Sequence, residues 1–250
     1  MTPVLETRGL VKRFGGIVAT RDVSIALQKG GRYALIGPNG AGKTTLVNVL
    51  TGMLAPSEGR ILLDGDDVTR RPSHERARRG LVRTFQINQL FESLTPLESL
   101  ALVIAQRENA GFQLFAPLAS KHVFVAESAA LLERLHLADV MYRRVRVLAY
   151  GKRRLLEIAI ALASRPRVLL LDEPIAGVPR DDSREILDTL AALPADVTVM
   201  LIEHDMDVVF RFAKEIMVLV DGALLAEGPA NEIARDARVK AVYLGEAVHG

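Results

Sequence analysis

One stretch of this 250-residue chain limits its possible folds more than any other. It consists of Gly37-Pro38-Asn39-Gly40-Ala41-Gly42-Lys43-Thr44-Thr45 and lies between two apolar runs, residues 33–36 and 46–50. A short strand, a glycine-rich turn and a helix in this order are the setting in which the pattern G-x-x-x-x-G-K-[ST] binds phosphate. The stretch therefore predicts an α/β fold that binds a nucleoside triphosphate.

Each residue type in this loop suits a phosphate ligand. Gly37, Gly40 and Gly42 permit backbone angles that a β-carbon obstructs, so the amides can turn inward. Those amides and the following helix N-terminus attract phosphate oxygens. Lys43 is expected to reach the β- and γ-phosphates, and the Thr44 hydroxyl is expected to hold Mg²⁺.

Composition narrows the class of protein. The chain is 49% hydrophobic with a mean hydropathy of +0.20, which fits parallel strands that are buried on both faces. No apolar run approaches the ~20 residues of a membrane-spanning helix, and the N-terminus lacks the features of a signal peptide. The absence of cysteine excludes disulfides and thiolate metal sites and fits a reducing cytosol.

The net charge is +2, and the arginines are clustered. The favoured interpretation of these clusters is a solvated face, and the second is attraction to an anionic membrane surface. Nucleic-acid binding is the least favoured interpretation, because no aromatic residues alternate with the first cluster. The two clusters are Arg70, Arg71, Arg76, Arg78, Arg79 and Arg83, and Arg143, Arg144 and Arg146.

The N-terminal part is predicted to contain an antiparallel β-subdomain. Strands are expected at residues 4–10 and 23–27 around a turn at Gly15-Gly16, and residues 61–63 with Asp64-Gly65 indicate another hairpin. An arginine-rich helix over 72–80 and a strand over 81–85 follow.

The middle of the chain is predicted to be a helical insert. Thr95-Pro96-Leu97-Glu98 is a capping box, and helical periodicity follows over 96–106, 122–137 and 152–163 with no strand between. Beyond it, strands are expected at 168–171 and 197–202, helices at 181–193 and 206–213, and a hairpin from 216. We predict one domain, with an α/β core of mainly parallel strands over 1–86 and 165–250 and a helical subdomain over 87–164.

Polar residues at strand ends are the candidate catalytic groups. Asp172 and Glu173 end the apolar run 168–171, where ligands bind in open α/β sheets. Asp172 is expected to hold the Mg²⁺ water shell, and Glu173 to orient or deprotonate an attacking water. His204 follows the next strand, and Gln86 ends the strand 81–85 with an amide able to bind Mg²⁺ or the water. A structural histidine and an ordinary polar strand end are the alternatives for these last two.

A second anion site is predicted at Ala149, Tyr150, Gly151 and Lys152, where Gly151 opens a helix. One chain offers one triphosphate site, so this helix N-terminus is expected to meet the nucleotide of a partner chain.

The order of phosphate loop, glutamine, second anion helix, acid pair and histidine resembles an ATP-binding-cassette transporter ATPase subunit, a P-loop NTPase cassette, over nearly the whole chain. It is most similar to the Liv-type ATPases of branched-chain amino acid importers. The residues that carry this likeness are Lys12-Arg13-Phe14-Gly15-Gly16, Arg83-Thr84-Phe85-Gln86, Tyr150-Gly151, Leu155 and Glu157, Glu203-His204-Asp205-Met206, and Val242-Tyr243-Leu244-Gly245-Glu246.

The resemblance implies further properties. Phe14 would stack on adenine, with Val18 also in the nucleotide site, and Gln86 would sense a membrane subunit. ATP would drive closure of a sandwich dimer with a second ATPase subunit, whether identical or different. The partners would be integral-membrane permease subunits and, indirectly, a solute-binding protein, with the chain bound peripherally at the cytoplasmic face of the cell membrane.

The chain departs from the family pattern at three positions. The family has serine and glutamine where this chain has Ala149 and Lys152, and usually aspartate or asparagine where Pro179 stands. These departures concern the rate of hydrolysis. Ala149 lacks the hydroxyl of the family's serine, and Lys152 is expected to replace that hydroxyl by a charge-assisted contact with the partner's nucleotide. Leu90 and Phe91 are expected to contact a membrane partner, with core packing as the alternative.

Three other functions stay open at this point. One is a lipopolysaccharide-type exporter ATPase of the same family. The second is a soluble cassette ATPase that acts on ribosomes or DNA, and the third is an ATP-binding regulator with weak turnover.

Overall fold

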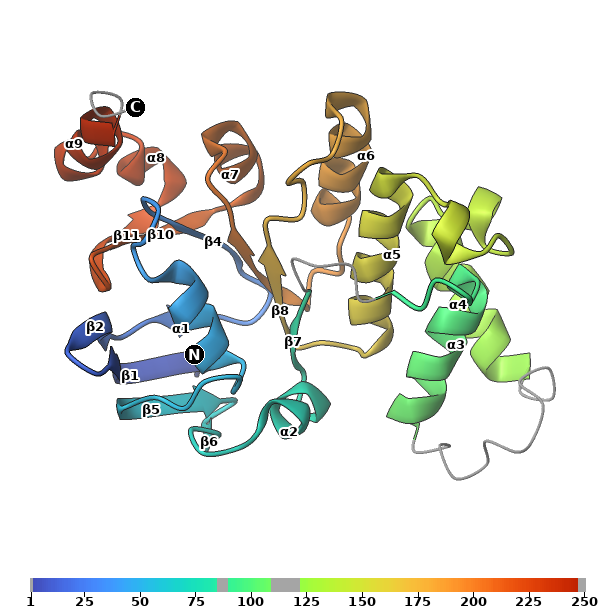
Figure 1. Cartoon of the computed structure of the whole chain (residues 1–250), viewed down its shortest axis with the longest axis horizontal. Helices are drawn as coiled ribbons and strands as arrows, with labels where there is room; N and C mark the ends of the chain where they lie inside the picture. The colour runs from blue at the N-terminus through green and yellow to red at the C-terminus, as the bar shows by residue number, and fades with distance from the viewer. Residues whose placement is uncertain (1, 85–89, 109–121, 247–250) are drawn as a thin grey trace. The chain divides into compact units, whose positions relative to one another are not determined.

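The computed structural model describes residues 2–84, 90–108 and 122–246 (Figure 1). The chain divides into two compact units. The first consists of Met1–Arg83, Arg167–Glu173 and Leu193–Gly250, and the second of Thr84–Pro166 and Pro174–Ala192. The segment 174–192 is therefore grouped with the helices, although the sequence places it in the core. The organisation as one cassette domain stays a prediction.

Six of the described strands form the central sheet of the first unit, in the order β11-β10-β4-β9-β8-β7. All neighbours are parallel except β10 and β11, which form the predicted hairpin. The strands are β4 (Arg32–Ile36), β7 (Leu81–Arg83), β8 (Val168–Asp172), β9 (Thr198–Ile202), β10 (Glu215–Val220) and β11 (Ala223–Pro229).

Burial explains why these short runs become central strands. Every residue of β8 and β9 is buried, as continuous apolar runs predict. In β4 the residues alternate between faces: Tyr33 and Leu35 belong to one core cluster, and Ala34 and Ile36 to the other. Parallel pairing places the carboxyl ends of these strands along one edge of the sheet.

A second sheet is antiparallel, in the order β2-β1-β5-β6 with β3 paired to β1. The Asp64-Gly65 turn has φ angles of 50° and 85°, as a tight hairpin requires, so the predicted hairpin is confirmed. The strands are β1 (Leu5–Phe14), β2 (Ile17–Val23), β3 (Ala26–Leu27), β5 (Glu58–Leu63) and β6 (Asp66–Asp67).

The first two strands differ from those predicted. They continue up to the Gly15-Gly16 turn, where Phe14 pairs with Ile17, instead of covering only 4–10 and 23–27. Register shifts interrupt the ladder between Leu10 and Arg13. Because a bulge breaks the alternation of faces, the periodicity of the sequence did not reveal the extension.

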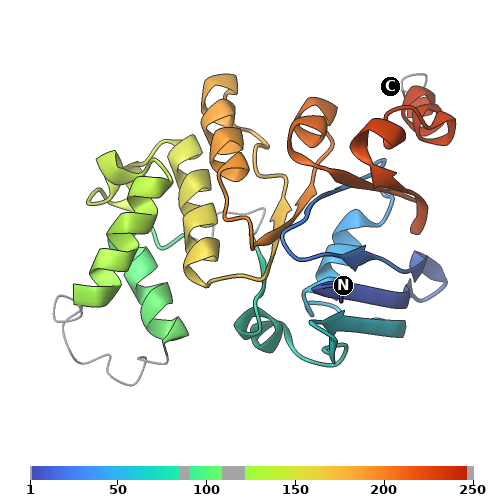
Figure 2. The ribbon, with the colours of Figure 1, turned by 180° about the vertical axis from the view of Figure 1, so that it is seen from behind.

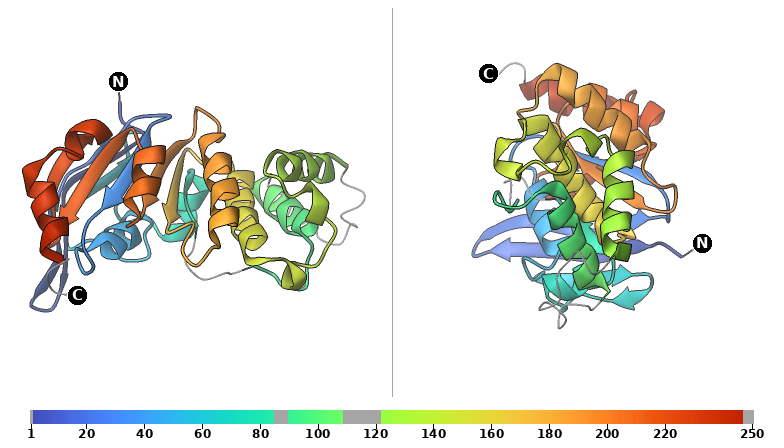
Figure 3. Two further views of the ribbon diagram at one scale, coloured as in Figure 1. Left: turned by 90° about the horizontal axis from the view of Figure 1, so that it is seen from above. Right: turned by 90° about the vertical axis from the view of Figure 1, so that its right-hand side faces the viewer.

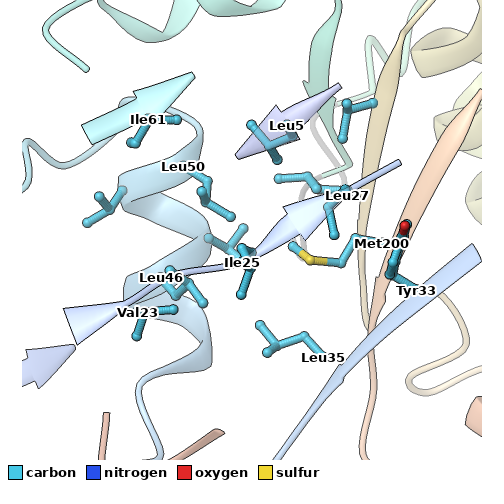
Figure 4. Close-up of a cluster of buried hydrophobic side chains, with 14 of the residues drawn as sticks. Leu5, Val23, Ile25, Leu27, Tyr33, Leu35, Leu46, Leu50, Ile61 and Met200 are labelled. Carbon is cyan, nitrogen blue, oxygen red and sulfur yellow. The ribbon is translucent and has the colours of Figure 1, made fainter. Parts of the chain in front are cut away.

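Helix α1 (Lys43–Leu50) packs against the main core of the first unit. Figure 4 shows Leu46 and Leu50 of this helix among Leu5, Val23, Ile25 and Ile61 of the antiparallel sheet region, with Leu35 and Met200 of the parallel sheet in the same cluster. Burying each such side chain contributes about 1.5–3 kcal/mol. This packing holds the helix, and the loop before it, in place.

A buried arginine contacts the other end of α1. Arg76, in α2 (Ser73–Arg78), is 1% exposed and donates hydrogen bonds to Val49 O (2.7 Å) and Leu50 O (2.6 Å) in the last turn of α1. A cation is favourable at the negative end of a helix dipole. The interpretation of the arginine cluster as a solvated face is therefore wrong for Arg76.

Three helices cover the other face of the parallel sheet (Figure 2). They are α7 (Met206–Phe212), α8 (Ala230–Ile233) and α9 (Ala237–Glu246), which contribute Val209, Ile233 and Val239 to the second core cluster. Within the described ranges, no helix has both the length and the apolar character that a membrane crossing needs.

The second unit is helical, as predicted (Figure 3). Its capping box is confirmed, because Thr95 Oγ1 accepts from Glu98 N and Glu98 Oε2 accepts from Thr95 N. Helix α4 ends at Arg134, three residues before its predicted end at residue 137. His136, just beyond it, has a left-handed φ of 57°. The elements are α3 (Pro96–Arg107), α4 (His122–Arg134), α5 (Tyr150–Ala163) and α6 (Arg180–Ala191), with short 3-10 turns at Ala138–Val140 and Val145–Val147.

Candidate functional site

The glycine-rich loop between β4 and α1 has the backbone that a phosphate cradle needs. Gly37 and Gly42 have φ angles of 149° and 97°. A β-carbon on Gly37 would lie 2.0 Å from Leu219 O, and one on Gly42 would lie 2.3 Å from Ala19 O. Only glycine fits these two positions, because neighbouring backbone would have to move for any side chain.

The start of α1 is suited to an anion. Gly42 is the N-cap residue, and the first turn contains no acidic residue, so the positive end of the helix dipole is not offset within the helix. The Lys43 ammonium donates to Gly37 O (2.5 Å) and Pro38 O (2.9 Å), and so lies over the loop itself. Thr44 is exposed and Thr45 half-buried in the same turn, and Asn39 and Gly40 are exposed at the tip.

The loop is held to the neighbouring strands by backbone hydrogen bonds. Gly222 N donates to Ala41 O (2.9 Å), and Arg21 N donates to Gly222 O (2.7 Å), so the β10–β11 turn joins the loop to β2. Phe14 lies at the end of β1, 46% exposed, with the Lys12 ammonium 4.9 Å from its ring centroid. Val18 is half-buried and pairs with Arg13. An exposed ring of this kind can stack on a base, and the adenine contact stays a prediction.

Asp172 ends β8 and forms an ion pair that the sequence did not reveal. Its Oδ2 accepts from Arg83 Nη2 at 2.5 Å, with the two side chains 5% and 8% exposed. Arg83 Nη1 donates to Asn48 Oδ1 of α1, also at 2.5 Å. The solvated-face interpretation is therefore also wrong for Arg83, whose guanidinium connects the acid strand to the phosphate-loop helix.

Glu173 follows the last residue of β8 and departs from extended backbone. It has a φ of 46°, a left-handed angle that is uncommon for a residue with a side chain, and its N–H donates to Ile202 O (2.9 Å). Such strained backbone gathers at functional sites. The Glu173 carboxylate lies 3.7 Å from His204 Nδ1, so the two predicted catalytic groups are brought together.

A second carboxylate near His204 was not assigned a role from the sequence. Glu203 is 2% exposed, and its Oε2 accepts from His204 N (3.2 Å) and lies 3.8 Å from His204 Nδ1. Burial raises the pKa of Glu203, because the charged form loses its hydration. In the part of the chain that the structure describes, its Oε1 has no hydrogen-bond partner. In the sequence, only the position of Glu203 at a strand end, next to His204, could have indicated a role for this residue.

The donor set fits a magnesium ion that is shared with a nucleotide. The Thr44 hydroxyl and the Asp172 carboxylate are oxygen donors, which Mg²⁺ prefers, and Mg²⁺ is usually bound by one or two carboxylates plus phosphates and water. Among the described residues, no group of three or more His, Cys, Asp and Glu could hold a metal by itself. Gln86 lies outside the described residues, so its predicted role stays a prediction.

The predicted cross-dimer segment belongs to the second unit. Ala149 is the N-cap of α5, where Gly151 is buried, and the Tyr150 hydroxyl donates to Ala176 O (3.1 Å). Lys152 Nζ donates to His136 O (2.7 Å) and lies 3.1 Å from Glu185 Oε1. The expected contact of Lys152 with a partner's nucleotide would have to compete with these contacts inside its own unit.

Comparison with known proteins places these features in a family. The family model described as "ABC transporter" matches residues 20–176, and one described as "Branched-chain amino acid ATP-binding cassette transporter" matches residues 223–249. The chain is 40% identical to the high-affinity branched-chain amino acid transport ATP-binding protein BraF of Pseudomonas aeruginosa, over 98% of this chain and 99% of that protein. It is equally identical, over the same shares, to LivG of Escherichia coli, which has the same description.

Solved structures agree with the fold. A nucleotide-free ATP-binding cassette from an ABC transporter superposes with a TM-score of 0.83 at 33% identity, over 96% of this chain and 98% of that one. An ADP-bound conformation of such a cassette has the same TM-score and identity, over 98% and 100% of the two chains. The predicted fold class is confirmed.

Proposed function

Because this chain belongs to the branched-chain amino acid (Liv-type) family of ATP-binding-cassette transporter ATPases, and is the ATP-binding subunit that couples ATP hydrolysis to transport, we propose that it drives import of branched-chain or related amino acids. The observation that carries the choice of solute is the match of residues 223–249 to the branched-chain amino acid model. The same match supports import over the exporter alternative.

The phosphate loop binds the triphosphate in this proposal. Its amides and the α1 N-terminus would donate hydrogen bonds to the phosphate oxygens, and the Lys43 ammonium would exchange its two loop carbonyls for the β- and γ-phosphates. Thr44, Asp172 and Gln86 would hold Mg²⁺, which when bound neutralises charge on the phosphates. Phe14 and Val18 would contact the adenine.

Glu173 is the proposed base. Its carboxylate extends from a strained residue at the sheet edge, where it can accept a proton from, or orient, an attacking water. His204, whose Nδ1 lies 3.7 Å from the Glu173 carboxylate, would contact the γ-phosphate and hold Glu173 in position. Gln86 would orient the water and report on the membrane subunit.

The proposed assembly contains a second ATPase subunit, permease subunits and a solute-binding protein at the cytoplasmic face of the membrane. Residues 149–152 would complete the nucleotide site of the second ATPase. Phe91 is 67% exposed, which supports a role for this residue as docking surface rather than as core.

The experiment measures uptake of labelled leucine, isoleucine and valine by the source cells after deletion of this gene. We expect uptake to fall, to return with the parent chain, and to stay low with Glu173→Gln, which keeps ATP binding. Unchanged uptake of all three amino acids, together with accumulation of an exported lipid, would contradict the importer and support the exporter.

A further inference from the structure

The ion pair between Arg83 and Asp172 connects three elements of the first unit. Arg83 is the last residue of β7. Its guanidinium donates one hydrogen bond to Asp172 at the end of β8 and one to Asn48 in α1, each at 2.5 Å. Taking both charges out of water is costly, and the cost is repaid only when each charge has a close partner. The pair therefore acts as a unit, because losing one partner together with its hydrogen bond would leave the other charge buried and unpaired.

The two largely buried arginines of this region use their donors differently. Arg76 donates to backbone carbonyls alone, at Arg71, Val49, Leu50 and Thr69, as a purely structural arginine does. Arg83 instead donates to a carboxylate and a side-chain amide, and among the described residues its Nε is buried without a hydrogen-bond partner. A guanidinium with an unsatisfied donor, bound to the acid of a nucleotide site, points to a role in the chemistry of that acid.

We propose that Arg83 is the resident counter-charge of Asp172, and that it sets how strongly Mg²⁺ contributes to nucleotide binding. The inference rests on the proposed role of Asp172 toward Mg²⁺. Arg83 touches neither substrate nor reacting atoms in this proposal; it is a positioning residue that holds one carboxylate oxygen and leaves the other for the metal's water shell.

Electrostatics gives the direction of the effect. Before Mg²⁺ arrives, Arg83 stabilises the buried carboxylate. The same cation would repel a bound Mg²⁺, because like charges interact strongly where water is largely excluded. Removing the charge of Arg83 therefore destabilises the metal-free site and stabilises the metal-bound one. Both changes increase the gain in affinity that Mg²⁺ provides.

The experiment measures ADP binding by titration calorimetry, once with Mg²⁺ and once with EDTA. The ratio of the two dissociation constants is the magnesium effect. Arg83→Gln removes the charge but keeps an amide donor for Asp172, so the protein should fold, and we expect its magnesium effect to rise about tenfold, equivalent to about 1.4 kcal/mol. Arg83→Lys keeps the charge and should stay within about twofold of the parent. Arg167→Met is the matched control, because it breaks the exposed ion pair with Asp64 at a distance from the acid pair.

Two results would overturn the inference. One is a magnesium effect in Arg83→Gln within twofold of the parent. The other is an equal change in Arg83→Gln and Arg83→Lys, which would assign the effect to lost packing rather than to charge.

Asp172→Asn separates this inference from the proposed function. If that variant kept the full magnesium effect, the proposed role of Asp172 would fail. If it lost the effect while Arg83→Gln matched the parent, the inference alone would fail.

Discussion

Arg76→Met tests whether a buried cation at the end of α1 stabilises the fold. The guanidinium donates four hydrogen bonds to carbonyls, from 2.6 Å to 2.9 Å, and the residue is 1% exposed. Methionine has a similar length and is apolar, so it fills most of the space but satisfies none of the four acceptors. The variant therefore isolates the contribution of the charged donors.

The magnitude follows from two opposing terms. Hydrogen bonds from a charged group contribute about 1.5–3 kcal/mol each. Burial opposes them by lowering the pKa of Arg76 to about 10, equivalent to about 3 kcal/mol of lost hydration. We expect a net loss of about 3–5 kcal/mol, because such bonds are not additive and methionine regains some apolar contact.

The assay is thermal unfolding followed by circular dichroism. For a chain of this size, each kcal/mol lowers the Tm by about 2–4 °C, so we expect a decrease of about 6–20 °C. Arg78→Met, at an exposed position of the same short helix, is the matched control and should change the Tm by less than about 2 °C. A decrease in Arg76→Met no larger than in this control would refute the reasoning, because it would mean that the four bonds only balance the cost of burying the charge.

Four further predictions concern the site and its surroundings. Glu173→Gln should keep ATP affinity and lower turnover about 10²–10⁴-fold, the usual loss for a general base; turnover within a few-fold of the parent in an ATPase assay would remove Glu173 from that role. Lys43→Ala should abolish ATP binding measured by calorimetry, and unchanged affinity would contradict the phosphate-loop assignment. Burial raises the pKa of Glu203, so its contribution to stability is complete below the ordinary glutamate value and is lost as pH rises through the raised value; Glu203→Gln should therefore flatten the fall of Tm with rising pH and raise Tm at neutral pH, whereas a Tm curve parallel to the parent's would contradict it. Phe91→Glu should leave the Tm and ATPase rate of the isolated chain unchanged but abolish uptake, and global unfolding would instead assign Phe91 to the core.

Local chemistry in the sequence determined a large part of this protein. The glycine pattern before Lys43 predicts a strand, loop and helix because few other backbones need glycine at those positions. The four residues from Thr95 specify a helix start through contacts within one turn. The runs 168–171 and 197–202 are continuous and apolar, which is typical of central strands of a parallel sheet, and parallel strands bring Asp172, Glu173 and His204 to one edge. Each of these predictions depends on neighbours within a few residues.

The roles of the arginines were decided by tertiary structure alone. Arg76, Arg78 and Arg83 belong to one cluster in the sequence, and nothing local distinguishes them. Arg78 is exposed, Arg76 meets the carbonyls that end α1, and Arg83 meets Asp172, 89 residues further along the chain. A buried charge persists only where distant parts of the chain supply its partners. The sequence therefore carries the charges, and the packing of α1 against the two sheets decides which of them leave the solvent.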